Sequence, residues 1–184
     1  MLKHQPIKER MTYAEEIQYL VANEKRNNFI SDLLLHLDGN TLCLFQLVEK
    51  HGKILYDKVK EKGNVHFVYG GTDATEREKI REIVNESKNS TTVASYGVFS
   101  TGINIPNINN IVLASPYKSK IRVLQSIGRG LRRSILKDSI LVFDIADDIS
   151  YRERQNFTLT HFTERLNIYN EEQFNYEISK VRLK

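Results

Sequence analysis

The sequence predicts an α/β domain with three layers and a mainly parallel sheet, and two patterns support this fold class. Short apolar runs have the length and composition of strands that are buried on both faces. Segments with helical periodicity separate several of these runs, and such alternation is typical of parallel sheets covered on both sides. The predicted strands are 41–46, 65–70, 91–96, 110–115 and 139–145, and the helices between them are about 48–62, 74–87 and 117–137.

Two helices are predicted before the first strand. Thr12, followed three residues later by Glu15, forms a capping box that begins a helix ending near residue 22. Asn23 can cap a second helix that ends at Asp38-Gly39. The remaining segments are predicted as a polar lead-in (1–11), a glycine-rich loop (97–107), a helical region (148 to about 169) and a short extended tail (175–183).

The composition is that of one ordinary globular domain. The chain has 184 residues, 40% of them hydrophobic, which is enough for one proper core. We divide it into a lead-in helix and linker (1–24), an α/β lobe (25–147) and a helical extension with a tail (148–184). The single cysteine, Cys43, lies in an apolar run and is expected to be a buried thiol in a reducing compartment. With no signal peptide and no membrane-spanning run, we expect a cytoplasmic protein without a membrane partner.

The charge is distributed unevenly along the chain. The formal net charge is only +4, but residues 117–137 carry seven Lys or Arg and no acid. The tail adds Lys180, Arg182 and Lys184, so both regions favour an anionic partner.

The basic segment 117–137 has two faces when it is drawn as a helix. One face is apolar and close-packing: Ile121, Leu124, Gly128 and Leu131. The other carries Arg122, Gln125, Arg129 and Arg132. Two interpretations remain open, a solvated basic face and a site for polyphosphate, which a row of guanidinium groups suits well.

The topology favours the phosphate interpretation. Ligands of parallel sheets collect beyond the carboxyl ends of the strands. Gly70-Gly71-Thr72, the loop 97–106 and the start of the basic segment all follow predicted strands, so they reach the same edge. In that loop the hydroxyl groups and Asn104 are suitable partners for a ribose or a phosphate.

Several other site signatures are absent from the sequence. There is no GxxxxGK[ST] phosphate loop, no GxGxxG fingerprint, no GxSxG elbow, no Cys-x-x-Cys pair and no histidine spacing typical of a metal site. The strand-end cluster Asp144, Asp147 and Asp148 is interpreted as a set of ion-pair partners rather than a general base.

Two motifs then point to a family. STGINIP (100–106) and QSIGRGLRR (125–133) resemble motifs V and VI of superfamily 2 helicases, and TLCLFQ is similar to motif IV. The segment YGGT with Arg77 resembles the region between motifs IV and V. The order and spacing resemble the second RecA-like lobe over 25–147, and the sequence is most similar to a phage branch that acts on branched DNA and RNA–DNA hybrids in recombination and repair.

The resemblance implies roles for individual residues. Arg129 and Arg132 occupy the motif VI positions that reach the γ-phosphate of ATP, and are therefore implied to be catalytic. Gly102, Asn104 and Gln125 match positions near the nucleotide, although relatives often carry Asp where this chain has Asn104. ATP and Mg²⁺ would be held mainly by a first lobe that this sequence does not contain. The candidates for nucleic-acid contact are Gly70, Gly71, Thr72, Ser95, Tyr96, Lys118 and Lys120.

The expected function is that of the second motor lobe of an ATP-dependent helicase. Its partners would be single-stranded and branched DNA, RNA–DNA hybrid and the N-terminal RecA-like lobe of the same protein. Without that lobe we expect essentially no ATP hydrolysis. Two alternatives remain: a duplex-DNA translocase lobe of a restriction or remodelling enzyme, and a nucleic-acid-binding module without enzymatic activity.

Overall fold

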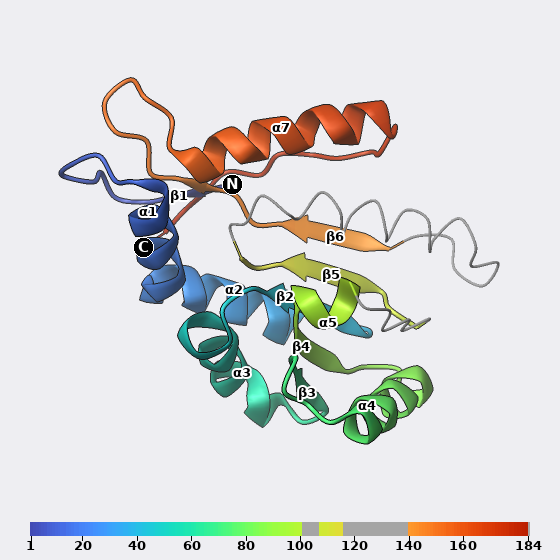
Figure 1. The fold of residues 1–184 in the computed structure, drawn as a ribbon. Coiled ribbons are helices and arrows are strands. Elements are labelled where there is room, and N and C mark those ends of the chain that lie inside the picture. The colour runs from blue at the N-terminus through green and yellow to red at the C-terminus, as the bar shows by residue number, and fades with distance from the viewer. Residues whose placement is uncertain (101–106, 116–139, 184) are drawn as a thin grey trace.

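The computed structural model describes residues 1–100, 107–115 and 140–183. Five strands form one sheet in the order β3-β4-β2-β5-β6, and every neighbouring pair is parallel (Figure 1). This confirms the predicted fold class and the position of each predicted strand. The strands are β2 (Thr41–Phe45), β3 (Val65–Val68), β4 (Thr91–Ser95), β5 (Asn110–Leu113) and β6 (Leu141–Asp144).

The helices cover both faces of the sheet, and α1 and α2 begin at the predicted caps. Thr12 and Glu15 form the capping box of α1, and Asn23 accepts a hydrogen bond from the Arg26 N–H at the start of α2. Asp73 caps α4 by accepting from the Thr75 N–H. The helices are α1 (Tyr13–Ala22), α2 (Glu24–His36), α3 (Lys53–Val59), α4 (Ala74–Glu86), α5 (Tyr96–Ser100) and α7 (Phe157–Glu171), with a π-helical turn η1 (Val48–Gly52) before α3 and a 3₁₀ turn η2 (Lys60–Lys62) after it.

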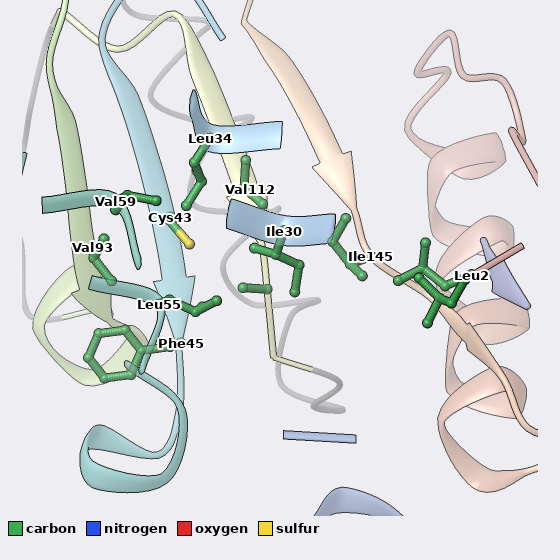
Figure 2. Packing of buried hydrophobic residues seen from close by; sticks show 12 residues of the cluster. Leu2, Ile30, Leu34, Cys43, Phe45, Leu55, Val59, Val93, Val112 and Ile145 are labelled. Carbon is green, nitrogen blue, oxygen red and sulfur yellow. The ribbon is translucent and has the colours of Figure 1, made fainter. Parts of the chain in front are cut away.

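The alternation of side chains along the strands builds two cores. Cys43 and Phe45 of β2 point toward α2 and α3, where they pack with Ile30, Leu55 and other apolar residues (Figure 2). Leu42 and Leu44 of the same strand belong to the core on the opposite face, which α4 and α7 cover. Cys43 is fully buried, and burial raises the pKa of its thiol to about 12, as expected of an inert thiol.

The segment after β4 differs from its prediction. Residues 97–107 were expected to form a loop, but Tyr96–Ser100 form the short helix α5. Tyr96 and Val98 are buried in the core, so tertiary packing stabilises a turn that the local glycine-containing sequence does not favour.

The two ends of the chain also differ from their predictions. The lead-in contains a strand, β1 (Leu2–Lys3), which lies between β7 (Asp147–Asp148) and β8 (Val181–Arg182) in a second parallel sheet. The C-terminal helix begins at Phe157 rather than near 148, because residues 147–148 belong to this sheet. Neither pairing is visible locally, since the partner strands are more than a hundred residues from β1 in the sequence.

A buried asparagine joins the amino ends of the central strands. Asn40 has no exposed surface, and its amide nitrogen lies within hydrogen-bond distance of three carbonyl oxygens, those of Val84 (3.0 Å), Ser87 (2.7 Å) and Asn107 (2.8 Å), which share its two hydrogens. Its amide oxygen accepts from the Ser90 hydroxyl at 2.8 Å. One side chain therefore joins the end of α4 and the segment that leads to β4 to the segment before β5.

Asn40→Ala should lower the free energy of unfolding by about 2 kcal/mol or more, because each buried polar group left without a partner costs about 1–3 kcal/mol. Urea unfolding followed by circular dichroism measures the loss. The matched control is Asn64→Ala, since Asn64 donates to Ser87 and Asn89 on the exposed surface. Equal effects of the two substitutions would contradict the role assigned to Asn40.

Candidate functional site

The carboxyl ends of the parallel strands lie together at one end of the sheet, which we call the carboxyl edge. The direction in which successive strands are added reverses at β2. The chain moves from β2 to β3 and β4 on one side, then crosses β2 to reach β5 on the other. Ligands of doubly wound sheets bind at such a reversal. Segments 101–106 and 116–139 follow α5 and β5, so the predicted residues Gly102, Asn104, Lys118, Lys120, Gln125, Arg129 and Arg132 lie outside the described residues.

A hydrogen-bond network fixes the end of β5 against the end of β2. Ser115 is buried, and its Oγ accepts from the Gln46 N–H at 2.9 Å. The Nδ1 of His51, in the π-helical turn η1, lies 2.9 Å from the same Oγ. Gly52 follows at a close approach, where an added Cβ would lie 2.5 Å from the Phe45 ring. The chain entering the basic segment therefore starts from a fixed position.

A buried arginine holds the residue before Ser115. Arg26 of α2 donates from Nη2 to the carbonyl oxygen of Ala114 (2.7 Å) and from Nε to Oδ1 of Asp147 (2.9 Å). His4 Nε2 also lies 2.9 Å from that oxygen. Burial alone would raise the pKa of Asp147, but the charge of Arg26 and the hydrogen bonds from His4 and Arg26 outweigh it and hold the pKa well below its usual range.

A second buried ion pair ties α7 to the end of β6. Arg165 donates to both carboxylate oxygens of Asp144, at 2.6 and 3.0 Å, and the Tyr169 hydroxyl donates at 2.6 Å. Burial and the charge of Asp144 raise the pKa of Tyr169. Asp148 pairs with Lys3 at 3.7 Å. The strand-end aspartates are therefore ion-pair partners, as predicted, and the described part of the chain holds no cluster of possible metal ligands.

The turn Gly70-Gly71-Thr72 presents backbone at the edge of the sheet. Thr72 is buried, and its Oγ1 accepts from the Tyr69 N–H at 3.0 Å, while its own N–H donates to the Tyr69 carbonyl oxygen. Gly70 and Gly71 are exposed. A Cβ at Gly71 would lie 2.6 Å from the Tyr69 ring, so any larger residue here would require that ring to move. Among the described residues predicted to contact nucleic acid, these two glycines are open to a ligand.

Ser95 and Tyr96 are less accessible than their predicted role requires. Their exposed fractions are 9% and 5%, and burial raises the pKa of Tyr96 far above its usual value. The ring of Tyr96 packs in the core beside Val98 and Tyr169. In this structure the Tyr96 ring therefore faces the core, and the proposed contact with nucleic acid would use mainly the backbone of Ser95 and Tyr96.

Sequence reasoning missed three buried polar residues: Arg26 and His51, which hold the end of β5, and Glu16, which accepts hydrogen bonds from the Phe157 and Thr158 N–H groups at the start of α7. Glu16, Arg26 and His51 each stand four residues before an apolar core residue of the same helical region, namely Leu20, Ile30 and Leu55. A polar residue at a position of the apolar stripe is the signal that could have found them.

The strand order and the helices on both faces of the sheet define the class of this domain. A parallel sheet in this order, covered by helices on both faces, is a RecA-like lobe, and no helix among the described residues is both long and apolar enough to cross a bilayer. The family described as "Helicase conserved C-terminal domain" matches residues 25–134, and the chain belongs to this family. Its sequence and its fold are similar to those of the helicase UvsW of phage T4.

The relatives support this assignment over nearly the whole chain. The ATP-dependent DNA helicase uvsW of Enterobacteria phage T4 is 37% identical over 94% of this chain and 37% of its own length. The crystal structure of T4 UvsW covers 100% of this chain and 40% of that one, with a TM-score of 0.87 and 35% identity. The E. coli DEAD-box protein SrmB shares the fold at a TM-score of 0.57 and 14% identity, over 100% of this chain and 89% of that one. The chain thus spans about two fifths of the UvsW relative.

The buried ion pair of Arg26 with Asp147 predicts how the free energy of unfolding depends on pH. Because the pKa of Asp147 is lower in the folded state than in the unfolded chain, where it is about 3.9, its stabilisation is complete above that value and is lost as the pH falls below it. Asp147→Asn should reduce the free energy of unfolding at pH 7 by about 3–5 kcal/mol, since it leaves Arg26 buried without a counter-charge. The difference from the parent chain should shrink below about pH 4.

Chemical denaturation between pH 3 and 8 measures this difference. Asp57→Asn, which breaks the exposed pair with Lys60, is the control and should leave the unfolding midpoint unchanged. If the difference in free energy of unfolding between the Asp147→Asn variant and the parent chain stays constant down to pH 3, the lowered pKa of Asp147 is contradicted.

Proposed function

We propose that this chain is the second motor lobe of an ATP-dependent helicase that acts on branched DNA and RNA–DNA hybrids, in recombination and repair, in the cytoplasm of a host cell. The observation that carries the proposal is the similarity to T4 UvsW along the whole chain, including the terminal sheet and α7. Motifs V and VI of the sequence agree with it. ATP binding would be shared with the N-terminal lobe of the full-length protein.

Arg129 and Arg132 are proposed to stabilise the charge that develops on the transferred phosphoryl group. The described contacts support this role indirectly. Gln46 donates a hydrogen bond to Ser115, and Arg26 donates one to the carbonyl oxygen of the preceding residue, Ala114. These two contacts fix the point from which the basic segment leaves the sheet. A catalytic arginine must be positioned to within a fraction of an ångström, so rigid support at its origin is physically useful.

The nucleotide's Mg²⁺ is proposed to be held by the first lobe. Asp144 is the strand-end carboxylate whose sequence context resembles a magnesium ligand, but Arg165 and Tyr169 already bind both of its oxygens. When bound, Mg²⁺ would neutralise charge on the phosphates. This chain's own contribution would be Gly102, Asn104 and Gln125 beside the nucleotide and the two arginines at the γ-phosphate.

Nucleic acid is proposed to contact this lobe through its phosphates, without sequence preference. The exposed backbone of Gly70 and Gly71 is suited to a close approach, and Lys118 and Lys120 would add charge. The backbone of Ser95 and Tyr96 remains a further candidate.

Arg132→Ala in the full-length protein should lower kcat for ATP hydrolysis by about 10³- to 10⁵-fold, because it removes charge stabilisation made in the transition state. Steady-state phosphate release in the presence of saturating DNA measures it. Arg133→Ala removes the next arginine of the basic segment, to which we assign no catalytic role, and is the matched control.

The isolated 184-residue chain should release no phosphate above background. If the Arg132→Ala variant hydrolyses ATP at the parent rate while its DNA binding collapses, the chain is a binding module and the catalytic assignment is wrong.

The choice between a helicase and a duplex translocase is tested by strand separation. The full-length protein should displace a labelled strand from a branched DNA and from an RNA–DNA hybrid in an ATP-dependent reaction. Displacement of a triplex-forming oligonucleotide from linear duplex serves as the comparison. Efficient triplex displacement without strand separation would favour the translocase alternative.

A further inference from the structure

The C-terminal tail exposes a row of large apolar side chains. After α7 the chain turns back and runs along this helix toward β8 (Figure 1). Phe174, Tyr176 and Ile178 in this segment are 37%, 44% and 45% exposed. They occupy alternate positions, so an extended chain places them on one face.

The two aromatic rings are held in place. Both pack on Tyr169, whose ring centroid lies 6.4 Å from that of Phe174 and 5.8 Å from that of Tyr176. The Tyr176 hydroxyl donates to Asn170 Oδ1 at 3.1 Å, and the Phe174 N–H donates to the Tyr169 carbonyl oxygen at 2.9 Å. Rings that are already ordered lose little entropy when a flat ligand stacks on them.

Basic residues continue the same row. In β8 the side chain of Leu183 is buried and that of Val181 is half-buried, so the odd-numbered positions face inward and Arg182 faces outward. Lys180 and Arg182 follow Phe174, Tyr176 and Ile178 at alternate positions and are exposed, and neither forms an ion pair within the described ranges. Three nearby acids outnumber these two basic residues: Glu171, Glu172 and Glu177, the last of which accepts a hydrogen bond from Ser179.

We infer that this row, defined as Phe174, Tyr176, Ile178, Lys180 and Arg182, binds single-stranded nucleic acid outside the motor edge. Bases would stack on the two rings, and Lys180 and Arg182 would contact phosphates. Aromatic rings for base stacking combined with basic side chains for phosphates are the chemistry of single-strand binding without sequence preference, and here two rings precede two basic residues. Because the nearby acids outnumber the two basic residues, stacking provides the main attraction.

This surface is separate from the proposed nucleic-acid contact at Gly70 and Gly71. The tail packs on α7, which is anchored to β6, whereas Gly70 and Gly71 follow β3 at the opposite edge of the five-stranded sheet. Strands are about 4.8 Å apart, so roughly 19 Å separates the two edges. The inference shares only its class of ligand with the proposed function.

The test is binding of fluorescein-labelled dT12 to the 184-residue chain, followed by anisotropy. Tyr176→Leu keeps an apolar cover over Tyr169 but removes the aromatic face, and should weaken binding about 5- to 100-fold. Tyr176→Phe retains the ring and should bind like the parent chain. Phe157→Leu is the matched control, because Phe157 is also 37% exposed but packs against Tyr13 at the start of α7.

Cross-linking in the full-length protein locates the strand. Irradiation of dT12 with one 5-iodouracil should attach the oligonucleotide to Phe174 or Tyr176, as read by peptide mass spectrometry. Arg132→Ala should abolish ATP hydrolysis yet leave this cross-link, so the two proposals fail independently.

Unchanged dT12 affinity in the Tyr176→Leu variant would overturn the inference. A second result would also overturn it: cross-links confined to other residues, together with a lower unfolding temperature of the Tyr176→Leu variant in the full-length protein. That result would mean that another part of the protein covers the row.

Discussion

The buried pairing of Arg26 with Asp147 is the constraint that joins the two sheets of this lobe. Neither side chain has any exposed surface, and the guanidinium group also donates to the end of β5 at Ala114. A buried charge is tolerated only when it is paired, so α2, β5 and β7 must keep their relative positions. The carboxyl ends of the central strands and the small sheet β7-β1-β8 are therefore held in fixed positions relative to each other. β1 pairs with β7, the strand that begins with Asp147, and β8 pairs with β1, so both strands near the chain ends are attached to the strand that carries this ion pair.

The sheet itself was predictable because its signal is local. Each strand is a short apolar run, and both of its faces are buried, as Leu42 and Cys43 show on opposite sides of β2. The helix starts at Thr12 and Asn23 were likewise predictable, since a cap is a short-range contact between a side chain and the next turn. The helix α5 and the strand β1 were not, because their stability comes from partners that are distant in the sequence.

The candidate site divides in a similar way. Motif spacing singled out Arg129 and Arg132, and the exposed glycines of the turn after β3 were visible as residues that allow close approach. The support beneath them was not visible. Ser115 meets Gln46 and His51 across 69 and 64 residues, and periodicity carries no information on such pairs. The sequence did offer one signal, a charged or polar residue on the apolar stripe of a helix, and this signal marks Arg26 and His51 but not Ser115 or Gln46.

The ion pair of Asp144 with Arg165 attaches α7, and with it the C-terminal tail, to the last strand of the central sheet. Tyr169 donates a hydrogen bond to Asp144 at the end of β6 and also supports the rings of Phe174 and Tyr176. A base stacked on Tyr176 would therefore be connected through one side chain to the last strand of the lobe. Motor lobes act on nucleic acid by changing their relative positions while ATP is bound and released. A strand held on the tail would move with this lobe as a rigid body, whereas the same side chains on a flexible linker would transmit no displacement.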